Sequence, residues 1–248
     1  MFKIALNAGH GYYTAGKRCL KALDANETRE WALNARICDM VQEKLKGYMG
    51  YEIIRLDDTT GKNDVSLRER TDKANAWGAD FYLSIHHNAG IDGGSGGGIV
   101  SVVYTSAGDE TVEWQKALYN SLIEHTGLKG NRSTPLAKMN LHECRESNMP
   151  AVLLELGFMD SKTDVPIILT ESYADKCATA IVEVLVVKGG LKKAAGETDN
   201  IADEYATDAV KWAIDNGILR GDGNGNYKLH SNISRQDMIV FLYRAMQK

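Results

Sequence analysis

The sequence predicts an α/β protein: a mostly parallel twisted sheet flanked by helices, followed by a small α-helical C-terminal domain. Short apolar runs such as Phe81–Ile85 alternate along the chain with segments whose apolar residues recur at helical spacing, such as residues 27–46. Strands that alternate with helices are typical of a parallel sheet covered on both faces. After a polar, glycine-containing stretch, residues 201–248 show two helical patterns only, which indicates a separate small domain.

The strands are predicted from apolar runs that end at polar residues or glycines. Residues 134–146 are ambiguous, because their short apolar patch at 136–141 is compatible with a strand between loops. The clear runs are residues 2–7, 51–56, 81–86, 99–104 and 151–156.

The helices are predicted from amphipathic spacing and from residues that begin or end helices. The first, residues 27–46, can be capped by Asp24 or Asn26. Gly78 and Gly127 end two of the others, since glycine tolerates the left-handed backbone at a helix C-terminus. The remaining predicted helices are residues 65–77, 109–125, 173–187, 204–216 and 234–246. The division that follows is a domain at 1–187, a linker at 188–200 and a helical module at 201–248.

Composition excludes several classes of protein. A net charge of −4 over 248 residues gives no basic surface for nucleic acid. No run approaches the ~20 apolar residues of a membrane span. The N-terminal MFKIALNAGHGYY holds an apolar run too short for a signal peptide, so we expect synthesis in the cytoplasm. Four cysteines without a C-x-x-C pair are expected to be free thiols.

Polar side chains follow three of the predicted strands. His10 lies in A-G-H-G after the first strand, His86 lies in S-I-H-H-N at the end of the third, and Glu155 lies within A-V-L-L-E-L-G-F. Because sites in α/β proteins gather beyond the carboxyl ends of strands, these side chains could converge. Strand alternation sends His86 and His87 to opposite faces, so only one of the two can easily serve a given site.

Each of these residues also has a structural explanation. His10 and His86 are equally compatible with histidines that carry no function. Glu27 at a helix start is favoured by the helix dipole and by a capping box with Asp24. Glu155 favours function, because a carboxylate within an apolar run is costly to bury unless paired, protonated or near a metal. Two histidines and a carboxylate would leave a tetrahedral zinc ion one open position for water, and such a site hydrolyses amides or esters.

These blocks resemble the zinc-dependent N-acetylmuramoyl-L-alanine amidases of the amidase-3 type. The blocks are A-G-H-G, a glutamate at the head of the first long helix, S-I-H-H-N and M-P-A-V-L-L-E-L-G-F, and the resemblance covers residues 1–187. It implies an amidase/phosphorylase-hydrolase-like fold with peptidoglycan as substrate. The bond cut would be the amide between N-acetylmuramic acid and the L-alanine of the stem peptide.

The resemblance also implies roles for individual residues. One Zn²⁺ per chain would be held by His10, Glu27 and His86. Glu30 is the alternative to Glu27 at the helix head, because the loop between His10 and the helix is poorly constrained. Glu155 would be the catalytic glutamate, and Arg132 in G-N-R-S-T-P-L would lie near the substrate groove.

The C-terminal module resembles a single S-layer homology repeat. The matching blocks are A-V-K-W-A-I-D-N-G-I, G-D-G-N-G-N-Y and S-R-Q-D before an apolar helix. Such repeats bind secondary cell-wall polymers, and the resemblance assigns Arg235 to that binding. A single copy is equally compatible with packing or with self-association into a homo-oligomer.

The expected role is that of a phage or prophage endolysin, made without a signal peptide and released by a holin to act at the cell wall. A role in sporulation-wall remodelling stays open. Two other functions compete with the amidase: a zinc peptidase that cuts the stem peptide, and a non-catalytic wall-binding protein that kept the fold.

Overall fold

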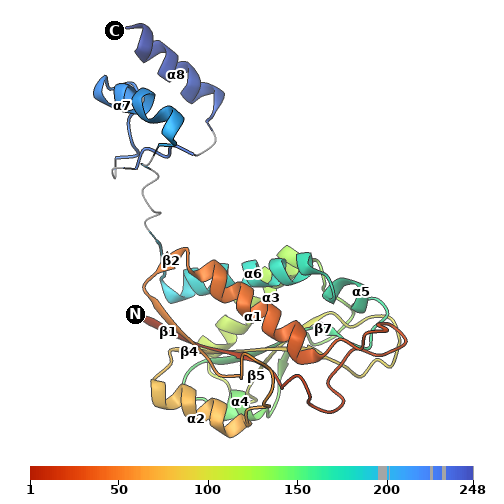
Figure 1. Cartoon of the computed structure of the whole chain (residues 1–248). Helices are drawn as coiled ribbons and strands as arrows, with labels where there is room; N and C mark the ends of the chain where they lie inside the picture. The colour runs from red at the N-terminus through yellow and green to blue at the C-terminus, as the bar shows by residue number, and fades with distance from the viewer. Residues whose placement is uncertain (195–199, 201, 224–225, 231–232, 248) are drawn as a thin grey trace. The chain divides into compact units, whose positions relative to one another are not determined.

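The structure is a computed structural model that describes residues 1–194, 200, 202–223, 226–230 and 233–247. The chain divides into two compact units, Met1–Lys192 and Lys193–Lys248, and each is described by itself (Figure 1). Residues 195–199 of the predicted linker, and residues 224–225 of the G-D-G-N-G-N-Y block, lie outside the described residues. Among the helices described, none has the length and apolar character needed to span a bilayer.

The first unit is built on a mixed sheet that is mostly parallel. Within the described residues its six strands lie in the order β3-β1-β4-β7-β5-β6. All neighbours pair in parallel except β5 and β7, which are antiparallel. In chain order the strands are β1 (Phe2–Ala8), β3 (Tyr51–Arg55), β4 (Phe81–Asn88), β5 (Ile99–Val103), β6 (Leu136–Lys138) and β7 (Ala151–Phe158). A separate pair joins β2 (Tyr48–Met49) to β8 (Lys192–Lys193). The predicted α/β class is confirmed.

Helices cover both faces of this sheet, as Figure 1 shows. On one face lie α1 (Glu30–Leu45), α3 (Asp109–Thr126) and α6 (Glu171–Gly189). On the other face lie α2 (Leu67–Trp77) and the short α4 (His142–Glu146). A single turn, α5 (Val165–Ile168), precedes α6. The second unit contains the 3-10 turn η1 (Glu204–Ala206), α7 (Thr207–Asp215) and α8 (Arg235–Met246).

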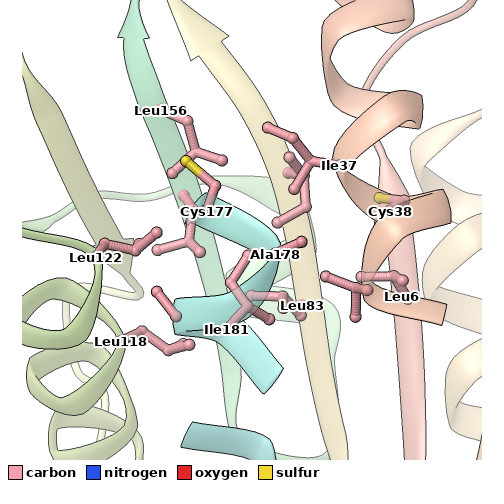
Figure 2. Close-up of a cluster of buried hydrophobic side chains, with 14 of the residues drawn as sticks. Leu6, Ile37, Cys38, Leu83, Leu118, Leu122, Leu156, Cys177, Ala178 and Ile181 are labelled. Atoms are coloured by element: carbon pink, nitrogen blue, oxygen red, sulfur yellow. The ribbon is translucent and has the colours of Figure 1, made fainter. Parts of the chain in front are cut away.

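The main core lies between the sheet and the three-helix face. Figure 2 shows side chains of α6, among them Ile181, between those of α1 and α3 and against leucines of the strands. Leu6 and Leu83 are register partners on β1 and β4, and both are fully buried. Burying a leucine side chain stabilises the fold by roughly 1.5–3 kcal/mol. All four cysteines are free and buried, as expected.

The first helix begins later than its amphipathic pattern predicts. Glu27 has a left-handed backbone, with φ of 48°, and therefore cannot belong to a right-handed helix. Asp24 accepts hydrogen bonds from the backbone N–H groups of Asn26 and Thr28, so it caps a turn ahead of the helix. The predicted capping box between Asp24 and Glu27 is wrong, and α1 starts at Glu30.

Residues 134–146 contain one element that the sequence did not predict. The strand β6 ends at Lys138, and the helix α4 follows from His142 to Glu146. Five residues are too few to show a helical period, which explains why α4 escaped prediction. This helix contributes to the candidate site, because it places Glu143 beside His86 on the face of the sheet that α2 and α4 cover.

Candidate active site

Three strand ends bring the candidate residues together. His86 on β4 and Glu155 on β7 are direct register partners. Ala8, the last residue of β1, is the partner of Ile85 on β4, so His10 follows β1 close to His86. The imidazole rings of His10 and His86 meet edge to face, with centroids 5.0 Å apart. The parallel arrangement of β1, β4 and β7 therefore gathers these side chains at one sheet edge.

A glutamate from α1 completes a cluster with the two histidines. Glu30 Oε1 lies 3.4 Å from His10 Nε2 and 3.2 Å from His86 Nδ1. One possible ligand atom from each of the three residues lies within 4.8 Å of the others. Two imidazoles and one carboxylate are the donor set of open, catalytic zinc sites, and a divalent zinc ion fits this group of residues.

The structure does not bring Glu27 into this cluster. Its carboxylate forms an ion pair with Arg18, 3.1 Å away, and its side chain is 29% exposed. Glu30 is 1% exposed and occupies the place expected for Glu27. The helical spacing of the sequence indicates that Glu30 is buried, since Glu30 lies on the same buried stripe of α1 as Leu33 and Ile37. A carboxylate on a buried stripe needs partners, whereas a solvated one does not.

His87 points away from the cluster, in line with strand alternation. Its Nδ1 lies 2.8 Å from Asn34 Oδ1 on α1. Burial lowers the pKa of His87 to about 3, so its ring is neutral. His87 thus belongs to the packing between β4 and α1, while His86 faces the candidate site.

Glu155 combines partial burial with an unsatisfied oxygen. The residue is half-buried, and its Oε2 is buried without a hydrogen-bonding partner among the described residues. Burial raises the pKa of Glu155 to about 7. Glu155 lines a cavity of about 300 Å³ together with Lys17, Glu30 and His86. A carboxyl group with this pKa can both accept and return a proton near neutral pH.

The charged groups of the cluster change one another's pKa. Burial alone would raise the pKa of Glu30, but hydrogen bonds from His10 and His86 outweigh it and lower the pKa. Burial alone would lower the pKa of His86, yet Glu143 and Glu30 raise it to about 10. A metal ion would have to displace the proton held by this ring, as is usual for histidine ligands.

Glu143 is a site residue that sequence reasoning missed. It lies in α4, is 4% exposed, and lines a cavity of about 360 Å³ with His10, Arg70 and His86. Its Oε2 lies 3.7 Å from His86 Nε2. The only sequence signal was a glutamate beside apolar residues in L-H-E-C, within the segment whose structure was ambiguous.

Two predicted binding residues lie outside the cluster. Arg132 is exposed, and its guanidinium lies 5.1 Å from the ring centroid of Phe158, the last residue of β7. Arg235 is the exposed first residue of α8 in the second unit, directly after the N-cap residue Ser234.

Comparisons with known proteins agree with this geometry. The Amidase_3 family profile, described as N-acetylmuramoyl-L-alanine amidase, matches residues 4–186, and the S-layer homology domain profile matches residues 198–239. A sporulation-specific N-acetylmuramoyl-L-alanine amidase of Bacillus subtilis (strain 168) is 31% identical over 234 residues, 90% of this chain and 86% of the relative. The endolysin of Bacillus phage SPP1 is 31% identical over 238 residues, 90% of this chain and 82% of the relative.

Solved structures agree as well. An N-acetylmuramoyl-L-alanine amidase from Clostridium difficile 630 is 25% identical, with a TM-score of 0.68 over 76% of this chain and 97% of that one. The catalytic domain of CwlV from Bacillus (Paenibacillus) polymyxa shares the fold at 22% identity, with a TM-score of 0.65 over 77% of this chain and 100% of that one. The chain therefore belongs to the Amidase_3 family of N-acetylmuramoyl-L-alanine amidases, which act on peptidoglycan, and carries an S-layer homology domain in its C-terminal part.

Proposed function

We propose that this amidase is zinc-dependent, with one Zn²⁺ per chain held by His10, Glu30 and His86. The observation that carries the proposal is the convergence of these three side chains within 4.8 Å. Glu155, the register partner of His86, adds the carboxylate that such chemistry requires. The bond cut would be the amide between N-acetylmuramic acid and L-alanine of the stem peptide.

The chain's own residues would perform the proton transfers. A zinc ion in this site would supply positive charge that polarises the substrate carbonyl and lowers the pKa of water to about 7. Glu155 would accept the proton of the attacking water on its carboxylate and then deliver it to the departing amine of L-alanine. Lys17 Nζ lies 3.7 Å from Glu30 Oε2 and so steadies the carboxylate oxygen turned away from the histidines. Arg132 remains the proposed substrate contact, through its exposed guanidinium.

Metal content and chelation test this proposal. We expect about one zinc per purified chain, loss of turnover after treatment with a strong chelator, and recovery on adding zinc. Activity that survives removal of all metal would contradict the zinc mechanism. Mass spectrometry of the products separates the amidase from the competing stem-peptide peptidase. An amidase releases peptides that begin with L-alanine, whereas a peptidase leaves L-alanine attached to the sugar.

We propose that the C-terminal unit binds a secondary cell-wall polymer, with Arg235 as a contact. The match of residues 198–239 to the S-layer homology domain supports this, and so does the exposure of Arg235. Self-association is the alternative, because α8 exposes a row of apolar side chains. These are Met238, Ile239, Leu242, Tyr243 and Met246. Sedimentation with purified walls, and analytical ultracentrifugation without them, separate the two.

We propose a lytic role, with release to the wall by a holin. The phage SPP1 endolysin among the relatives supports it, while the equally identical sporulation-specific amidase supports the sporulation alternative. Expression of the protein in a Bacillus host, with and without a holin, tests the endolysin role. Lysis that depends on the holin supports the endolysin role, and unchanged growth in both strains contradicts it.

A further inference from the structure

Glu143 is a buried carboxylate that the proposed reaction does not use. It is 4% exposed and projects from α4 toward the sheet. Its Oε1 accepts hydrogen bonds from Tyr82 Oη at 2.6 Å and from Asn7 Nδ2 at 2.8 Å. Its Oε2 is directed toward His86 Nε2, 3.7 Å away. Ser84 Oγ also lies within reach of both carboxylate oxygens, 3.3 Å from Oε1 and 3.4 Å from Oε2. A buried carboxylate held by three donors is fixed in orientation, so Oε2 points in a defined direction.

A buried arginine, Arg70, anchors the residues that surround Glu143. Arg70, which is 1% exposed, donates to Asn7 Oδ1 and to the carbonyl oxygens of Ala8, at 2.7 Å, and His10, at 3.1 Å. The chain of contacts therefore runs from Arg70 through Asn7 to Glu143 and on to His86. The same arginine holds the backbone of His10, so the network reaches two of the proposed ligands.

The two nitrogens of His86 face different partners. Nδ1 faces the metal cluster, 3.2 Å from Glu30 Oε1, and Nε2 faces Glu143. A neutral imidazole carries its hydrogen on one nitrogen only, so ligation through Nδ1 requires the hydrogen on Nε2. Among the described residues Nε2 is buried without a partner at hydrogen-bond distance, and Glu143 Oε2 is the carboxylate facing it. A buried N–H left without an acceptor would cost about 1–3 kcal/mol.

We propose that Glu143 is a positioning residue for the metal site: it accepts the Nε2 hydrogen of His86 and thereby presents Nδ1 to the metal. Histidine ligands commonly donate their second N–H to a carboxylate, which fixes the tautomer and the ring orientation. The inference rests on the proposed zinc site, and it concerns a residue that neither motif nor periodicity singled out.

Nuclear magnetic resonance of the full-length, zinc-loaded wild type tests the tautomer directly. Histidine labelled with ¹⁵N shows which ring nitrogen carries hydrogen, and comparison with His86→Asn assigns the signals of His86. We expect a protonated Nε2 and a metal-bound Nδ1. A protonated Nδ1 with zinc on Nε2 would overturn the proposal.

Substitution tests the contribution of the carboxylate to binding. Glu143→Leu removes both acceptor oxygens and should weaken zinc affinity about 10–100-fold in a chelator competition assay. Glu143→Gln keeps an acceptor oxygen and should recover part of that loss. The absorption bands of the cobalt-substituted protein should shift in Glu143→Leu, a readout that altered packing away from the metal would not move.

Cys144→Ala is the matched control, because it loosens the packing of the same helix on Val102 without touching His86. It should keep wild-type zinc affinity. Wild-type affinity and cobalt bands in Glu143→Leu would overturn the proposal while leaving the zinc site intact. A wild type that binds no zinc would instead refute the proposed function. If Glu143→Leu does not fold, the tautomer measurement on the wild type decides.

Discussion

Residues three positions apart differ sharply in environment at the start of α1. Glu27 lies in a left-handed turn and pairs with Arg18 near solvent, whereas Glu30 is buried against His10 and His86. A solvated ion pair contributes little to stability, about 0–1 kcal/mol. Removing Glu30, in contrast, would take away the carboxylate of a three-ligand site. Metal binding, and not stability, is therefore the property that distinguishes Glu30 from Glu27.

Replacing each glutamate with alanine should separate their roles. Glu30→Ala should lose zinc because only two ligands remain, while Glu27→Ala should retain about one zinc per chain. Elemental analysis of the two purified variants beside the wild type measures this. Zinc lost from Glu27→Ala and retained in Glu30→Ala would reverse the assignment.

Glu155→Gln should separate catalysis from metal binding. The substitution preserves shape but removes the group that accepts and returns a proton, so turnover should fall about 10²–10⁴-fold. Zinc content and melting temperature should stay close to wild type, because Glu155 is not among the three proposed ligands. A turbidity assay on purified walls measures the loss, and wild-type clearing would revive the non-catalytic wall-binding protein.

The turn after β1 shapes the site through close packing of the backbone against His86, in addition to supplying the proposed ligand His10. Gly9 directly follows β1 and packs against His86, and a Cβ atom at this position would overlap the imidazole ring. His10, the next residue, has a left-handed backbone with φ of 65°. The turn after β1 therefore depends on a residue without a side chain, which lets His10 and His86 approach each other.

Gly9→Ala should disturb the site without removing any ligand. The added methyl group would push the His86 ring aside, and zinc affinity should fall by roughly tenfold or more. Gly47→Ala is a suitable control, because a Cβ there meets its nearest neighbour, Lys44 O, at an ordinary 3.5 Å. Chelator competition compares the two variants. Equal affinities would show that the β1 turn tolerates a side chain.

At the scale of the whole molecule, the two units differ in how much core they hold. Leu191 is 7% exposed and belongs to the core of the first unit, and Lys192 and Lys193 form the strand that pairs with β2. The helices α7 and α8 of the second unit contain no buried residue among those described. A segment of about 50 residues can bury only a small core by itself.

Truncation after residue 194 should leave the chemistry intact. This end point keeps both Leu191 and β8 in the fragment, so the fragment should fold, bind zinc and cleave soluble muropeptides at close to the wild-type rate. Its sedimentation with purified walls should decrease if the second unit supplies wall affinity. A fragment that unfolds or loses turnover would contradict the independence of the first unit.

The sequence by itself determined the α/β class, five strands of the main sheet (β1, β3, β4, β5 and β7), the longer helices, and the three strand ends that carry His10, His86 and Glu155. Those features follow from local patterns: apolar runs, helical spacing and side-chain alternation. It left open which glutamate joins the histidines, because φ at Glu27 and the start of α1 depend on hydrogen bonds within the preceding loop.

Tertiary structure alone decided the antiparallel β5 and the presence of Glu143 beside His86. Glu143 lies 57 residues after His86 in the chain, on a five-residue helix with no detectable period. Its contacts with Asn7, Tyr82 and Ser84 arise only once α4 packs under the sheet. Local sequence specifies which residues share a face of one element, whereas the meeting of faces from distant elements depends on packing of the whole domain.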